Sequence, residues 1–182
     1  MNFTGPLGSL RKHFPQWNEI LTVFSFVAFA VFSWALFAFL NHLPSSLLNV
    51  SLPEIAVLFC FELAIALLES LFVCGLIVLL AVIFPRRWLR EGFACKGFLI
   101  ALAWGLASIL SSRFTLYPAQ PSFLAVLALC LIVLIAAIIL VDKYPNLRKL
   151  LLAFVNRFDI FSYIYLPLGI IGVIVVLIRN VF

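Results

Sequence analysis

Two glutamates stand inside the longest apolar run of this sequence. Glu62 and Glu69 interrupt the stretch from Glu54 to Pro85, which otherwise consists almost entirely of apolar side chains. Because they are seven residues apart, they fall on the same face of a helix. A charged side chain at the centre of a membrane helix costs about 2.5 kcal/mol or more, so it normally has a partner or a function. These two carboxylates are therefore the starting point for any functional hypothesis.

The composition places the chain in a lipid bilayer. Of its 182 residues, 66% are hydrophobic and only 10% are charged, which is more apolar surface than a soluble domain can hide. At roughly 20 apolar residues per span, the chain has material for five spans. We predict an all-α integral membrane protein, a single domain over 1–182, with transmembrane helices at about 17–41, 55–84, 97–112, 123–141 and 160–178.

A sixth helix is predicted at about 146–158, between the last two spans. Its apolar residues share one side, whereas its basic residues lie elsewhere on the helix, a pattern typical of a helix in the headgroup region. The alternative is a simple cytoplasmic extension of the last span. The apolar side consists of Leu147, Leu150, Leu151, Phe154 and Phe158.

The basic residues indicate the orientation of the chain. With five spans, ten of the twelve lysines and arginines fall on one side of the membrane and two, Arg113 and Arg179, on the other. The positive-inside rule then places the N-terminus in the cytoplasm and the C-terminus outside, in a plasma or inner membrane. The predicted anchors at the cytoplasmic interface are Arg86, Arg87, Arg90, Lys96, Lys143, Arg148, Lys149 and Arg157.

This orientation moves Glu62 and Glu69 to the outer half of the bilayer. Other polar residues are expected at the same level, at the outer ends of the first and third spans: His42, Ser108, Ser111, Ser112 and Arg113. Three interpretations stay open. The cluster could bind a cation, a proton or a polar head group; it could be a structural ion pair with Arg113 or a hydrogen bond to serine; or another subunit could supply the partner.

Several classes of protein are excluded by what the sequence lacks. Its two histidines lie outside the middle of every span, which argues against axial haem ligation. It has no HExxH, GxSxG or Walker motif, and its four cysteines form no CxxC pair. No basic face suits a nucleic acid. We therefore expect no enzyme activity, no cofactor, no metal and no nucleic-acid partner.

The main hypothesis is a non-catalytic integral subunit of a larger membrane complex, packing against partner subunits and membrane lipid. The alternative is a small transporter or substrate-capture component that uses a site made by Glu62, Glu69 and Arg113. In addition, five spans with the N-terminus inside and the C-terminus outside resemble the membrane anchor of lipoteichoic-acid-synthase-type sulfatases. That resemblance is one of topology, and it implies an anchoring role without the catalytic ectodomain.

Overall fold

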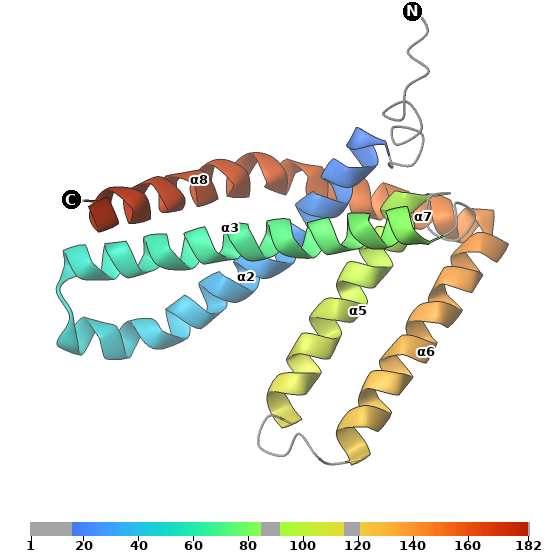
Figure 1. Ribbon diagram of the computed structural model, residues 1–182, viewed down its shortest axis with the longest axis horizontal. Helices are drawn as coiled ribbons and strands as arrows, with labels where there is room; N and C mark the ends of the chain where they lie inside the picture. The colour runs from blue at the N-terminus through green and yellow to red at the C-terminus, as the bar shows by residue number, and fades with distance from the viewer. Residues whose placement is uncertain (1–15, 85–91, 115–120, 182) are drawn as a thin grey trace, which may run out of the picture. The chain divides into compact units, whose positions relative to one another are not determined.

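The computed structural model describes residues 16–84, 92–114 and 121–181, and the regular elements in these ranges are all helices (Figure 1). Four helical stretches in this part of the chain are long and apolar enough to cross a membrane: Trp17–Leu48, Leu52–Ile83, Phe93–Leu110 and Pro145–Arg179. The protein is therefore a multi-pass helical membrane protein, as the composition predicts. The elements are α2 (Trp17–Asn49), α3 (Leu52–Ile83), α5 (Phe93–Phe114), α6 (Pro121–Lys143), α7 (Pro145–Val155), the 3-10 turn η1 (Asn156–Phe158) and α8 (Asp159–Val181).

The helices extend past the predicted boundaries. The first helix continues to Asn49, beyond the predicted end near residue 41, and includes Pro44. Membrane helices tolerate proline because neighbouring groups satisfy the freed backbone. Close to this proline, the hydroxyls of Ser45 and Ser46 donate to the carbonyl oxygen of His42 at 2.7 and 3.1 Å. A second difference is at α5, which begins at Phe93 instead of near residue 97.

The contacts divide the chain into two compact units, Met1–Val23 with Leu76–Arg157, and Phe24–Gly75 with Phe158–Phe182. In the second unit, α3 and α8 approach closely at two glycines of α8. A Cβ atom on Gly169 would lie 2.8 Å from the Cβ of Leu67, and one on Gly172 would lie 2.8 Å from the carbonyl oxygen of Cys60. Small residues at such positions let membrane helices pack backbone to backbone.

Aromatic rings fill the contact between α2 and α8 in the same unit. Phe29 packs against Phe161, with 4.6 Å between ring centroids, and Phe32 stacks on Tyr165 at 4.8 Å. Ring pairs at these distances contribute about 0.5–1.5 kcal/mol beyond the burial of their surface. The α2–α8 contact thus rests on interlocking rings, whereas the α3–α8 contact rests on close backbone approach.

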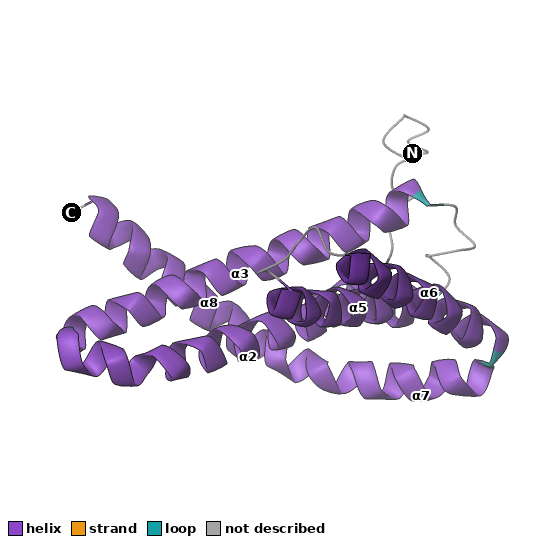
Figure 2. Cartoon of the chain, turned by 90° about the horizontal axis from the view of Figure 1, so that it is seen from below, coloured by secondary structure: helices purple, strands orange, loops and turns teal. Residues whose placement is uncertain are grey.

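In the first unit, α5 and α6 lie side by side and α7 runs across the end of this hairpin. Figure 2 shows α7 along its length while α5 and α6 are foreshortened. Two contacts attach α7 to the start of α5. The Cys95 thiol donates to the carbonyl oxygen of Arg148 at 3.6 Å, and the rings of Phe98 and Phe154 meet edge to face with 6.0 Å between centroids.

Candidate functional site

Helix α3 has one face covered by the chain and another that is exposed. The residues that lie against α8, among them Leu63, Ala64 and Leu67, are buried. The exposed residues Leu58, Glu62, Ile65, Glu69 and Phe72 recur with spacings of four, three, four and three. This is the spacing with which two helices in a left-handed pair meet. We call these five residues the acidic stripe.

The acidic stripe lies well inside the length of the helix. At 1.5 Å per residue, Glu62 lies ~15 Å from the start of α3, and Glu69 lies ~26 Å from the start and ~21 Å from the end. Neither carboxylate can reach a helix end, and burial in lipid would leave each without water. A charged group at the centre of a membrane helix costs about 2.5–3.5 kcal/mol on insertion scales, and Glu69 lies closer to the middle of α3 than Glu62 does. When the stripe faces hydrocarbon, its two carboxylates therefore have neither water nor a protein partner to offset this cost.

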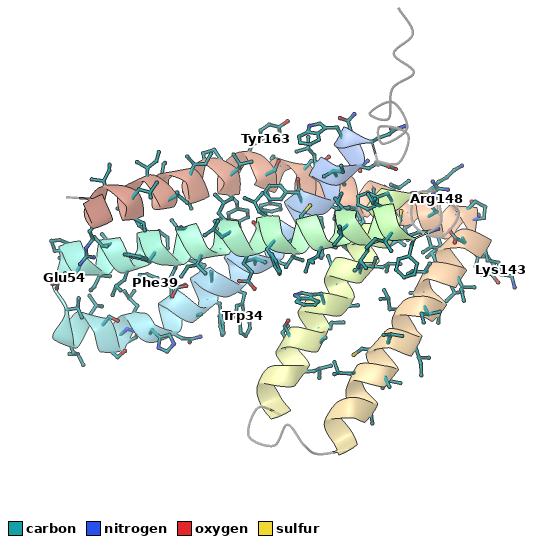
Figure 3. The ribbon with its side chains drawn as sticks, in the orientation of Figure 1. Trp34, Phe39, Glu54, Lys143, Arg148 and Tyr163 are labelled. Carbon is teal, nitrogen blue, oxygen red and sulfur yellow. The ribbon has the colours of Figure 1, made fainter. Side chains whose placement is uncertain are left out.

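Among the described residues, neither Glu62 nor Glu69 makes a hydrogen bond or an ion pair. The third glutamate of this helix behaves differently. Glu54, labelled in Figure 3 at the turn between α2 and α3, accepts hydrogen bonds from the backbone nitrogen and the hydroxyl of Ser51 at 3.0 and 2.7 Å. The bond from the Ser51 nitrogen is one half of a capping box, in which the glutamate accepts from the backbone nitrogen of the N-cap residue. Glu54 therefore has a local structural role, which the Glu62–Glu69 pair lacks.

The predicted polar cluster draws its members from both units. His42 is exposed on α2, in the same unit as Glu62 and Glu69. The remaining predicted members lie on α5, in the other unit, and the side chains of three of them fall outside the described residues: Ser111, Ser112 and Arg113. Ser108 is exposed on the same helix. The meeting of these residues with the two glutamates stays a prediction.

The predicted basic anchors have different environments. Lys143, Lys149 and Arg157 are exposed, whereas Arg148 is half-buried against Gly92. Gly92 has a φ of 76°, and a Cβ there would lie 2.8 Å from the Arg148 guanidinium. The positive φ favours glycine at this position, whereas the flexible end of the Arg148 side chain would move aside at little cost. Three further anchors lie outside the described residues: Arg86, Arg87 and Arg90.

Lys96 is buried inside the first unit instead of facing a head group. Its side chain is 1% exposed, and Nζ lies 2.7 Å from Oδ1 and 2.9 Å from Oδ2 of Asp142, which is 47% exposed. The pair joins the first turn of α5 to the last turn of α6. Sequence reasoning missed it, although an acid at the end of one apolar run and a lysine at the start of another were a usable signal. A buried lysine needs such a partner, since an isolated buried charge is costly.

The described residues do not form a metal centre. No group of three or more His, Cys, Asp or Glu side chains in this part of the chain comes close enough to hold an ion. Cys60, Cys74, Cys95 and Cys130 are free thiols that are buried or half-buried. Their surroundings suit the packing role of small apolar side chains.

Comparison of the chain with models of known protein families, with curated proteins and with solved structures finds no significant match. The acidic stripe of α3 is therefore the feature of the chain that points most directly to a function.

Proposed function

We propose that this protein is a non-catalytic integral subunit of a larger membrane complex, and that the acidic stripe of α3 is the face that a partner subunit covers. One observation carries the proposal: Glu62 and Glu69 lie on an exposed face of α3, deep within the helix and without a partner among the described residues. A helix from another subunit that brings a cation or hydrogen-bond donors would remove the cost of placing these acids in lipid.

Besides its two acids, the stripe carries large apolar side chains of the kind that pack at a contact between two helices. Ile65 and Phe72 alternate with the two glutamates and are 55% and 66% exposed. A partner helix would pack against these apolar side chains while its polar group reaches the carboxylates. Leu58 extends the stripe by one more position. Polar contacts between membrane helices contribute about 0.6–2 kcal/mol each, so packing and polar contacts would act together.

We further propose that the chain crosses the membrane five times, through α2, α3, α5, α6 and α8. Helix α6 supports this count, because it is 23 residues long and its first charged residue is Asp142. The Lys96–Asp142 ion pair also supports the proposed orientation, since it holds the start of α5 and the end of α6 at the same level. The basic segments that precede α5 and follow α6 then face the same side, which the positive-inside rule makes cytoplasmic.

The second candidate is a small transporter or substrate-capture component. The same exposed carboxylates favour it, because Glu62 and Glu69 could bind a cation or a polar head group together with Arg113. The membrane anchor of a lipoteichoic-acid-synthase-type sulfatase is a further possibility that topology alone supports. These candidates differ from the main proposal in what the carboxylates contact: a solute or a head group instead of a protein helix.

The experiment is the double substitution Glu62→Gln and Glu69→Gln in the full chain, followed in native membranes by blue native electrophoresis and by solute or lipid uptake. The proposal predicts that the chain leaves its complex and migrates alone. Glu54→Gln is the matched control, because it removes an acid from the same helix at its cap, and that variant should stay in the complex. An intact complex with lost uptake would overturn the main proposal in favour of the transporter, and no change in either would overturn both.

A further inference from the structure

Helix α7 has two different apolar faces. One face packs onto the hairpin, where Leu152 is half-buried and Val155 is fully buried. On another side, Leu147, Leu150 and Phe154 are 37%, 69% and 49% exposed. These three residues are spaced three and four apart and therefore form a continuous strip on a helix. The strip stays partly exposed after α7 has packed against α5 and α6, although the Phe154 ring also meets Phe98 edge to face.

Three exposed cations lie on α7 or close to its two ends in the chain. Lys149 lies on α7 itself, Lys143 ends α6, and Arg157 follows α7 in η1; all three are exposed. Two other charged groups near α7 are engaged within the unit: the Arg148 guanidinium lies against Gly92 and interacts electrostatically with Glu19, and Asp142 pairs with Lys96. Tyr144, which is 50% exposed beside Lys143, is an aromatic residue of the kind found at membrane–water interfaces.

The direction of α7 fits a bilayer surface. It runs across the end of the α5–α6 hairpin, so when those two helices cross the membrane, α7 lies along its surface (Figure 2). The contacts of Cys95 with Arg148 and of Phe98 with Phe154 fix it in this position. An apolar strip with cations nearby in the chain, on a helix in the membrane plane, is the pattern of an interfacial helix.

We propose that α7 is a binding surface for anionic phospholipid, with Leu147, Leu150 and the exposed side of the Phe154 ring facing acyl chains and Lys143, Lys149 and Arg157 bound to lipid phosphates. A zwitterionic leaflet satisfies the apolar strip and offers phosphates, but it carries no net negative charge to balance three cations. A leaflet with a negative surface potential attracts each of them. The proposal does not depend on the acidic stripe of α3 or on its partner.

The test uses the full chain in nanodiscs made of phosphatidylcholine alone or of phosphatidylcholine with phosphatidylglycerol, and measures hydrogen–deuterium exchange over Pro145–Val155. The expected result is exchange at least about tenfold slower with phosphatidylglycerol, since each cation near an anionic surface contributes roughly a fivefold effect. High salt should remove this difference in the unsubstituted chain, because the interaction is screened.

Two variants separate charge from side-chain identity. The neutral variant Lys143→Gln, Lys149→Gln, Arg157→Gln should lose the lipid-dependent difference, whereas the charge-conserving variant Lys143→Arg, Lys149→Arg, Arg157→Lys should keep it. Equal exchange in the two lipids for the unsubstituted chain would overturn the proposal. So would a difference that survives both the neutral variant and high salt.

Discussion

The buried ion pair between Lys96 and Asp142 gives the clearest prediction at the scale of single residues. Asp142→Asn leaves a fully buried ammonium group without its counter-charge, and should lower the free energy of unfolding by about 1–3 kcal/mol. Lys96→Met together with Asp142→Asn should restore most of that loss, because no buried charge remains. Thermal unfolding in detergent measures both. A double variant no more stable than Asp142→Asn would show that the lysine's environment is not the one described.

Some of this residue-level detail could be read in the sequence, and some could not. The four-residue pattern from Ser51 to Glu54 is a recognisable capping signal. The pairing of Lys96 with Asp142 was harder to read: both stand at ends of apolar runs, but they are 46 positions apart and meet only when α5 and α6 pack. For the same reason Lys96 looked like an interfacial anchor. The positions of Glu62 and Glu69 on one helix face could be predicted, but not that this face would be exposed.

At the scale of helices, the close approach of α8 to α3 makes a testable prediction at Gly172. A Cβ there meets the carbonyl oxygen of Cys60 at 2.8 Å and the backbone nitrogen of Ala64 at 3.1 Å. Gly172→Ala should therefore destabilise the protein by about 1–3 kcal/mol, since backbone must shift to admit the methyl group. Gly105→Ala is the matched control, with open space around its Cβ, and should be neutral or slightly stabilising. Equal effects of the two substitutions in detergent unfolding would contradict the α3–α8 contact.

The helices themselves were the most predictable part of the fold. Long apolar runs must form their backbone hydrogen bonds internally in lipid, so each run becomes a helix. The ends were less predictable, as α2 shows by continuing through Pro44 to Asn49. The side of α3 that would be covered was not predictable either, because a helix that is apolar on nearly all sides carries no amphipathic signal. The covered side of α3 is the one that packs against the glycines of α8, which lie far from α3 in the sequence.

At the scale of the whole molecule, the proposed five-span topology predicts opposite accessibility for two exposed basic residues. In intact cells, a membrane-impermeant maleimide should label Arg179→Cys from outside, but should label Lys149→Cys only after the membrane is permeabilised. The unsubstituted chain, whose described cysteines are buried or half-buried, is the control for background labelling. Labelling of both variants from the same side would show that α8 does not cross the membrane, and would contradict the proposed five-span topology.

The central claim is that a partner helix covers the acidic stripe, and site-specific photo-cross-linking in native membranes tests it most directly. A photoreactive residue replaces Ile65 or Phe72 in the stripe, or Leu71, which is also exposed on α3 but lies on another side of the helix. The account predicts a discrete protein adduct from positions 65 and 72, its loss with Glu62→Gln and Glu69→Gln, and no such adduct from position 71. Adducts with lipid alone at 65 and 72, or the same protein adduct from all three positions, would contradict it.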